Sequence, residues 1–259
     1  MIPVIKLISV AILAVLTVIL FACARDASDS LSQIRKKGEI RFAVSMGYIP
    51  FSFYGANKEK VGFDIDVAKE MARRLGVKAV FIDVPWDKII ETLRSGACDA
   101  IVSSMAITSE REALVDFTEP YYYSRAHLFV RKGAVLKKVR EAKGKVIGCS
   151  RATTYEQDAR RLEAGKVVLC ENDEVALEQL VLKNVDAVIT DEIIGMYSIR
   201  YLQMPIMPLG DSLRSEHIAV AVRKNDTALL KAINRIIKDM REKGIIRKLT
   251  EKTAEGKYR

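Results

Sequence analysis

The sequence has few of the residues that most often carry covalent or metal chemistry. Its 259 residues include two histidines, four cysteines and one tryptophan. It contains no HExxH, Walker or GxGxxG motif, no CxxC pair and no other metal-ligand spacing. Neither His127 nor His217 has a neighbouring nucleophile that would suggest a hydrolytic triad, and both are expected at strand edges. The sequence therefore predicts no metal, no cofactor and no catalytic residue.

The sequence also lacks a block of charge of one sign. The formal net charge is +9, but the 42 Lys and Arg residues are scattered among 33 Asp and Glu residues. Hydrophobic content of 49% and charged content of 29% are typical of a globular protein. We interpret the basic excess as a solvated surface and expect no nucleic-acid partner.

Long apolar runs are absent except near the N-terminus. Lys6 precedes an apolar run from Leu7 to Ala22, which is typical of a signal peptide and, at 16 residues, short for a membrane span. Leu20-Phe21-Ala22-Cys23 resembles the lipobox of bacterial lipoproteins, in which Cys23 would carry the lipid, although Phe21 is unusual there. A plain cleaved signal and an uncleaved anchor are the alternatives. All three place the folded part outside the cytoplasm.

The other three cysteines are Cys98, Cys149 and Cys170. Because they lack the spacing of metal ligands, we expect them to be small buried hydrophobic residues. Cys149 and Cys170 each close a predicted strand, so the sequence leaves open a disulfide between them in an oxidising compartment.

Strands and helices alternate from residue 31 onward. The pattern predicts strands at 40–44, 77–84 and 99–104, and helices at 64–75 and 86–95. Asp64 is expected to cap the first of these helices and Gly76 to end it. Strands that alternate with helices form βαβ units, so this half is predicted to be a doubly wound lobe with a parallel sheet.

The same plan occurs a second time. Strands are expected at 146–149, 167–170 and 186–190, and helices at 154–163 and 173–183. The third strands are similar in sequence, Cys98-Asp99-Ala100-Ile101-Val102 and Val185-Asp186-Ala187-Val188-Ile189. We therefore predict an α/β fold of two equivalent doubly wound lobes.

Two such lobes would bring their strand ends to one crevice, where open α/β sheets bind ligands. The first lobe offers Ser103, Ser104 and Arg111, and the second offers Thr153, Thr154 and Asp191. A cation on one wall and an anion on the other would suit a zwitterion. The alternatives are structural: an exposed helix position for Arg111, and helix caps for Asp191 and the threonines.

Several stretches together resemble the polar amino-acid-binding proteins of bacterial ABC importers, the family 3 extracellular solute-binding proteins with the type II periplasmic binding protein fold. The stretches are Tyr48-Ile49-Pro50-Phe51-Ser52-Phe53, Gly62-Phe63-Asp64-Ile65-Asp66, Ser103 to Thr108 with Arg111, Asp116 to Tyr121, Gly144 to Gly148, Thr153 to Glu156, and Val185 to Asp191. Each stretch is weak alone, but their order and spacing are specific over residues 31–250.

The resemblance implies roles for ten residues. Tyr48 and Trp86 would flank the ligand's side chain, although core packing is the alternative for both aromatic residues. Arg111 would bind the α-carboxylate, and Asp191 would accept from the α-ammonium group. The remaining members would surround the ligand: Ser103, Ser104, Ala106, Thr153, Thr154 and Tyr155.

The sequence departs from the family at the positions that set specificity. Ser45 stands where members that bind cationic or amide side chains carry Asp, which weakens a preference for Lys, Arg or Gln. Ala106 replaces a Ser of some members, and Tyr155 lies at a variable position. The identity of the amino acid therefore stays open.

The N-terminal apolar run and the connections between the predicted strands and helices give a domain plan. Residues 1–22 would be the signal peptide and 23–30 a tether, followed by lobe 1 (31–124 and 216–259) and lobe 2 (125–215). A strand at 127–130 would enter lobe 2, a strand at 218–222 would return, and a helix at 226–243 would complete lobe 1. Two crossings make a hinge, so we expect closure around the ligand.

The expected partners are an L-amino acid, a membrane permease of an ABC importer, and the membrane itself through the lipid anchor. The protein is expected to be a monomer on the periplasmic or extracellular face of the cell membrane.

Two other functions are compatible with this fold. Cyclohexadienyl and arogenate dehydratases use a cleft carboxylate as general acid. Their Glu would correspond to Ile194 here, so Glu119, Asp173 or Glu174 would have to replace it. The third possibility is a sensing module whose closed state a separate partner detects.

Overall fold

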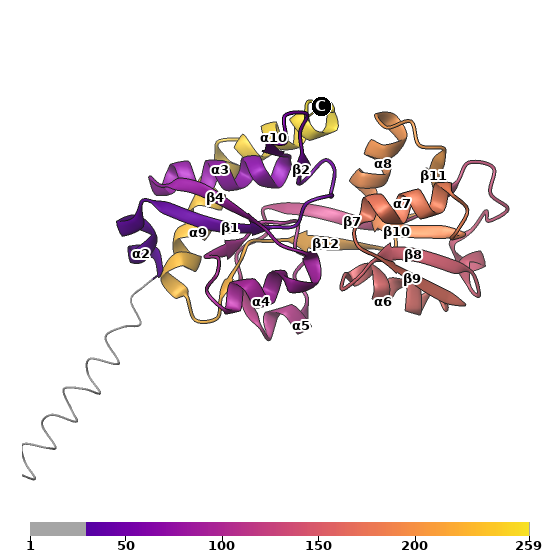
Figure 1. Ribbon diagram of the computed structural model, residues 1–259, viewed down its shortest axis with the longest axis horizontal. Helices are drawn as coiled ribbons and strands as arrows, with labels where there is room; N and C mark the ends of the chain where they lie inside the picture. Colours follow the sequence, from indigo (N-terminus) through magenta and orange to yellow (C-terminus); the bar gives the residue numbers. More distant parts are fainter. Residues whose placement is uncertain (1–29, 259) are drawn as a thin grey trace, which may run out of the picture.

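The computed structural model describes residues 30–258. The predicted signal peptide and Cys23 lie outside the described residues, as does nearly all of the tether. Within the described part, no helix is both long and apolar enough to span a membrane. Figure 1 shows an elongated molecule with two lobes side by side along its long axis.

The first lobe contains a five-stranded sheet. Its strand order is β4 (Lys78–Asp83), β1 (Glu39–Val44), β5 (Ala100–Ile101), β13 (Ala221–Arg223) and β6 (Val115–Phe117). β1 runs parallel to β4 and β5, whereas β13 is antiparallel to β5 and β6. The sheet is therefore mixed, with the predicted parallel strands at one side and the returning chain at the other.

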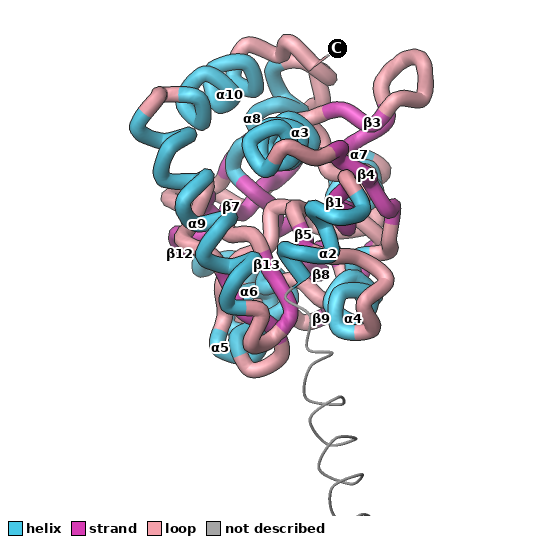
Figure 2. The backbone as a smooth tube through the Cα atoms, turned by 90° about the vertical axis from the view of Figure 1, so that its left-hand side faces the viewer, coloured by secondary structure: helices cyan, strands magenta, loops and turns pink. Residues whose placement is uncertain are grey.

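Helices cover both faces of this sheet (Figure 2). One face carries α2 (Ser30–Lys37), α3 (Phe63–Leu75), α9 (Thr227–Glu242) and α10 (Ile245–Ala254), and the other carries α4 (Ile89–Arg94) and α5 (Ser109–Glu112). Phe42 belongs to the core cluster on the α3 side, and its neighbour Ala43 to the cluster on the α4 side. Adjacent strand residues face opposite sides, so β1 is buried on both.

The second lobe repeats the plan. Its strand order is β11 (Ile206–Pro208), β7 (Tyr122–Arg131), β10 (Ala187–Asp191), β8 (Val146–Ser150) and β9 (Lys166–Cys170). β8 is parallel to β10 and β9, and β7 is antiparallel to β10 and β11. Helices α7 (Asp173–Val181) and α8 (Glu192–Arg200) lie on one face and α6 (Thr154–Arg161) on the other (Figure 1). The predicted α/β class with two doubly wound lobes is confirmed.

Two strands connect the lobes. β7 and β12 (Arg214–Ile218) form an antiparallel pair at the centre of the molecule (Figure 1), in which Ser124 lies opposite Glu216. The predicted lobe boundaries, after residue 124 and before residue 216, thus fall opposite each other within one strand pair. They stay a prediction, because the pairing is continuous across them.

Asp64 does not cap helix α3, although the sequence predicted that it would. α3 begins at Phe63, and Gly62 is its N-cap. A Cβ on Gly62 would lie 2.2 Å from the carbonyl oxygen of Phe51, and its φ of 128° also favours glycine. Asp64 therefore falls inside the first turn, where it is fully buried.

Two further expectations need correction, and the question of a disulfide, which the sequence left open, has an answer in the structure. The helix expected at 86–95 is a 3₁₀ turn, Trp86–Lys88, followed by α4, and the strand expected at 218–222 is divided between β12 and β13. Cys149 and Cys170 are free thiols. Ser150, not Cys149, lies opposite Cys170 in the β8–β9 register, so the two thiols face opposite sides of the sheet.

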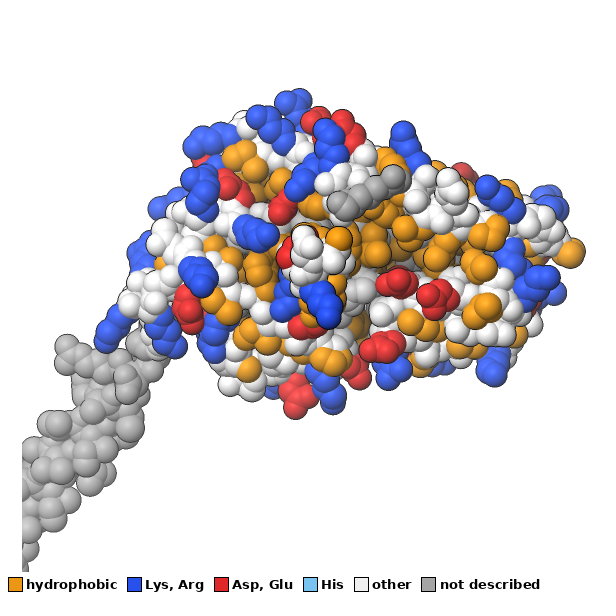
Figure 3. Space-filling model, turned by 45° about the horizontal axis from the view of Figure 1, so that its top comes forward, with side chains coloured by type: hydrophobic (Ala, Val, Ile, Leu, Met, Phe, Trp, Pro, Cys, Tyr) orange, Lys and Arg blue, Asp and Glu red, His pale blue; other side chains and the backbone are white. Residues whose placement is uncertain are grey.

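The surface agrees with the expected scatter of charge. On the face seen in Figure 3, Lys and Arg side chains are distributed over both lobes with Asp and Glu among them. This face shows no continuous basic stripe of the kind that binds nucleic acid.

Candidate functional site

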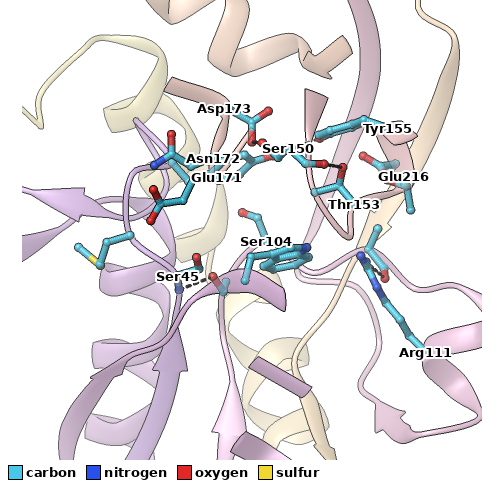
Figure 4. A pocket seen from close by; sticks show the side chains of 16 residues that line it. Ser45, Ser104, Arg111, Ser150, Thr153, Tyr155, Glu171, Asn172, Asp173 and Glu216 are labelled. Atoms are coloured by element: carbon cyan, nitrogen blue, oxygen red, sulfur yellow. Dashed lines mark hydrogen bonds between the residues drawn. The ribbon is translucent and has the colours of Figure 1, made fainter. Parts of the chain in front are cut away.

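A cavity lies between the lobes, where the carboxyl ends of the parallel strands from both sheets meet. The space between its walls, including the part that is open to solvent, is about 510 Å³. Nine of the ten predicted ligand-binding residues line it: Tyr48, Trp86, Ser103, Ser104, Ala106, Arg111, Thr153, Thr154 and Tyr155. In Figure 4, Arg111 and Glu216 lie at one end and Glu171 and Asn172 at the other. The sequence thus identified most of this lining.

Hydrogen bonds from behind hold the loop of Ser103 and Ser104 in place. The backbone N–H of Ser45 donates to Ser103 Oγ at 2.9 Å, and Ser104 Oγ donates to Asp64 Oδ2 at 2.8 Å. The Tyr121 hydroxyl donates to Asp64 Oδ1 at 2.7 Å and accepts from the N–H of Ser104. Ser104 has a φ of 47°, which is uncommon for a residue with a side chain. Asp64 therefore stabilises the serine loop in this conformation.

Burial raises the pKa of Asp64 to about 7, although its bonds from Tyr121 and Ser104 favour the charged form. Its carboxyl group is thus close to titration at neutral pH.

Arg111 supplies a partly buried cation to the cavity. Thr108 caps the short helix α5 by accepting from the N–H of Arg111. Nη1 of Arg111 donates to the carbonyl oxygen of Ala106 at 2.8 Å, and the guanidinium lies 5.2 Å from the centre of the Trp86 ring. Burial lowers the pKa of Arg111, while the nearby carboxylate of Glu216 acts in the opposite direction. An arginine nevertheless keeps its charge at neutral pH.

No carboxylate forms a salt bridge with Arg111 in the described part of the chain. A buried charge without a counter-ion is costly, so this position favours an incoming anion. The planar donor group of arginine suits a carboxylate, which it can bind through two hydrogen bonds.

The two walls contact each other around the cavity. Trp86 Nε1 of lobe 1 donates to the carbonyl oxygen of Ala152 in lobe 2 at 3.0 Å, and Arg111 Nη2 reaches the same oxygen at 3.4 Å. The hydroxyls of Tyr48 and Tyr155 lie 3.2 Å apart. The structure is therefore a closed arrangement of the lobes.

Asp173 is the first acidic group of the lobe 2 wall. It opens helix α7 and lines the cavity, with 3% of its surface exposed. Ser150 Oγ donates to Asp173 Oδ2 at 2.7 Å, and Thr190 Oγ1 donates to Oδ1. Burial raises its pKa to about 6 in spite of these two bonds. Both of its oxygens are engaged within lobe 2.

Asp191 is the one predicted site residue that does not line the cavity. It caps helix α8, where Oδ1 accepts from the N–H of Ile193 at 2.7 Å, and Oδ2 accepts from Ser124 Oγ. Burial raises its pKa to about 7. The capping interpretation of Asp191 thus matches the geometry, and its contact with an ammonium group stays a prediction.

The side chain of Thr153 does not cap helix α6, contrary to the capping interpretation. Thr153 stands at the N-cap of α6 but makes no side-chain cap bond, because its Oγ1 donates to the carbonyl oxygen of Ser150 at 2.6 Å.

Sequence reasoning missed several lining residues. They are Met46, Ser150, Glu171, Asn172 and Glu216, whereas the sequence identifies Ser45 only as a specificity position and Asp173 only as an alternative acid. Residues 171 and 172 follow β9 as Trp86 follows β4, so the repeated plan of the lobes could have identified them. Glu216 lies on the connecting strand β12, and no motif of either lobe points to it. Within the described residues, no group of three or more His, Cys, Asp or Glu side chains could hold a metal ion.

Comparison with known proteins agrees with this geometry. Residues 40–255 match the family model of bacterial extracellular solute-binding proteins, family 3. The histidine-binding periplasmic protein of Escherichia coli K12 is 30% identical over 254 residues, which cover 93% of this chain and 95% of that protein. The L-cystine-binding protein TcyJ of the same strain is 28% identical over 225 residues, covering 86% and 85%.

A solved structure shares the fold. The ancestral amino acid-binding protein AncCDT-1, described as a precursor of cyclohexadienyl dehydratase, superposes with a TM-score of 0.81 and 34% identity, covering 86% of this chain and 98% of that one.

Proposed function

Because the chain belongs to the bacterial extracellular solute-binding proteins of family 3, we propose that it binds an L-amino acid between its lobes and delivers it unchanged to the permease of an ABC importer. The observation that carries this proposal is Arg111, a partly buried cation in the interlobe cavity that forms no salt bridge in the described chain. The ligand's α-carboxylate would supply the missing anion. The names of the histidine- and cystine-binding relatives support an amino acid as the ligand.

The charges around the cavity favour a ligand with additional positive charge. The lining contains one cation, Arg111, and three carboxylates, Glu171, Asp173 and Glu216. Arg214 already forms an ion pair with Glu216, but Glu171 and Asp173 form no salt bridge in the described chain, and an amino acid with a cationic side chain would supply a positive charge opposite them. Ser45 lacks the carboxylate that members binding cationic side chains carry at this position of lobe 1. The carboxylates of lobe 2, on the facing wall, would contact the cationic group in its place.

The proposal includes a location outside the cytoplasm. Residues 1–22 would be a signal peptide, Cys23 would carry a lipid anchor, and the protein would act as a monomer. These features are proposals from the sequence pattern.

Calorimetry tests the proposed function. The purified protein would be titrated with each of the twenty amino acids and with L-cystine. We expect micromolar or tighter binding of at least one of them, with the strongest binding among cationic ligands. Absence of heat with all of them would overturn the proposal.

Dehydration of a ring substrate is not supported by the cavity. Ile194 occupies the place of the general acid in that branch, and neither Glu119 nor Glu174 lines the cavity. Asp173 does line it, but both of its oxygens accept hydrogen bonds from hydroxyl groups, which favours a carboxylate over a proton donor. Turnover of prephenate or arogenate would establish the enzyme instead.

A further inference from the structure

Trp86 contacts the cation of the interlobe cavity. It is the only tryptophan of the sequence and opens the 3₁₀ turn Trp86–Lys88 that follows β4. The guanidinium carbon of Arg111 lies over its ring, 5.2 Å from the ring centre. A cation within about 6 Å of the centre of an indole ring is attracted by the π electrons of that ring. Because Arg111 Nη1 also donates to the carbonyl oxygen of Ala106 at 2.8 Å, the ring and this carbonyl together restrain the guanidinium on the lobe 1 wall.

Trp86 and Arg111 also share a contact on the opposite lobe. The carbonyl oxygen of Ala152 accepts from Trp86 Nε1 at 3.0 Å and from Arg111 Nη2 at 3.4 Å. A carbonyl oxygen has two lone pairs, so it can accept both bonds. The loop that presents this oxygen is tied to lobe 2, because the N–H of Arg151 donates to the carbonyl oxygen of Cys170 at 2.9 Å. Trp86 and Arg111 therefore meet lobe 2 at one shared acceptor.

We propose that Trp86 is a positioning residue that acts through Arg111. Its ring keeps the guanidinium where the ligand's α-carboxylate is bound, and its indole N–H ties the pair to Ala152 when the lobes are closed. This inference rests on the proposed function, in which Arg111 binds the α-carboxylate. It goes beyond the resemblance, which places Trp86 beside the ligand's side chain.

The two roles of Trp86 predict different responses to removal of the ligand's negative charge. L-Argininamide and L-histidinamide keep the side chain and the ammonium group of their parent amino acids but lack the α-carboxylate. If Trp86 acts through Arg111, its loss weakens binding of the amino acid much more than binding of the amide. If Trp86 flanks the side chain, its loss weakens binding of both by the same factor.

Calorimetry with such a pair of ligands measures the affinities of three variants. Trp86→Leu removes the ring and the donor, so the amino acid should bind about 10-fold more weakly and its amide less than about twofold more weakly. Trp86→Phe keeps a ring but lacks the donor, and should lose only about threefold for the amino acid. Phe117→Leu is the matched control and should keep the affinity, because Phe117 packs against the same core cluster as Trp86 but does not line the cavity.

Combination of Trp86→Leu with Arg111→Ala gives an independent test. Two residues that act as a unit have non-additive effects, so without the guanidinium the loss of Trp86 should weaken binding less than about twofold. Additive losses in the double variant, or equal losses for amino acid and amide in Trp86→Leu, would overturn the positioning role and leave amino-acid binding intact. If Trp86→Leu loses its folded circular dichroism spectrum, Trp86→Phe provides the same comparisons with a smaller effect. Failure of the unaltered protein to bind any amino acid would overturn both proposals.

Discussion

The two walls of the cavity differ in how their charged groups are used. The lobe 1 wall presents a cation, Arg111, and a serine loop that a buried carboxylate, Asp64, holds from behind. The lobe 2 wall presents carboxylates, and Asp173 is satisfied by hydroxyls of its own lobe. A ligand that carries both charges would contact both walls at once in this closed arrangement of the lobes.

The largest effect in this comparison should come from removing the lobe 1 cation. Arg111→Ala deletes the group proposed to make two charge-assisted hydrogen bonds to the ligand, and leaves the lobe 2 carboxylates unopposed. We expect a loss of affinity of about 100-fold or more, or roughly 3 kcal/mol. Calorimetry with the best-binding amino acid measures it, and Arg140→Ala, an exposed arginine of lobe 2, is the control. Equal heats from Arg111→Ala and the unaltered protein would refute the asymmetry of the walls.

A smaller effect should follow from keeping the walls apart. Gly47 of lobe 1 has a φ of 84°, and a Cβ there would lie 2.7 Å from the amide nitrogen of Asn172 in lobe 2. Asn172 cannot move freely, because its Oδ1 accepts from the N–H of Val175 and so caps α7. Gly47→Ala should therefore weaken ligand binding about 10-fold, since closure would disturb a cap that contributes about 1 kcal/mol.

The matched control for this substitution is Gly133→Ala. Gly133 has a similar φ of 78°, but no atom lies within 4 Å of the position that a Cβ would take there, so only the backbone strain is reproduced. Both variants should lose stability in thermal unfolding, whereas only Gly47→Ala should lose affinity. An equal loss of affinity in both would show that strain, and not contact between the walls, is responsible.

A further expected effect is a pH dependence of stability to which both lobes contribute. Burial raises the pKa of Asp64 and of Asp191 to about 7 in the folded protein. Between about pH 4 and pH 7 the folded protein keeps protons that the unfolded chain has lost. These two groups should therefore lower the free energy of unfolding as the pH rises from about 4 to about 7.

Urea unfolding at several pH values measures this slope. Asp64→Asn should remove the contribution of lobe 1, and Asp191→Asn that of lobe 2, so the two variants compare the lobes directly. A slope unchanged in both variants would contradict the assignment.

The sequence predicted the lobe 1 wall better than the lobe 2 wall, for a physical reason. Ser103, Ser104, Ala106 and Arg111 lie in one continuous stretch after a buried strand, so a single pattern identifies them. Lobe 2 assembles its wall from separate segments, and Glu216 comes from a connecting strand whose partner, β7, is about ninety residues away. Such a contact depends on the register of two distant strands, which no local pattern encodes.

Local competition explains two of the differences between expectation and structure. Aspartate is a common helix cap, but Gly62 stands at the N-cap of α3. The carboxylate of Asp64 instead accepts a hydrogen bond from the hydroxyl of Ser104. Asp191 could either cap a helix or face a ligand, and the sequence left both open. Its bond to Ser124 depends on β7 running beside it, which only the folded sheet reveals.

The opposed orientation of Cys149 and Cys170 has a practical consequence for handling the protein. All three described thiols are buried, and burial raises the pKa of Cys98 to about 11 and that of Cys149 to about 12. Thiolate is the reactive form, so these residues resist oxidation and exchange. The folded chain should consequently be obtainable with or without a reducing agent, and without help from enzymes that form or rearrange disulfides.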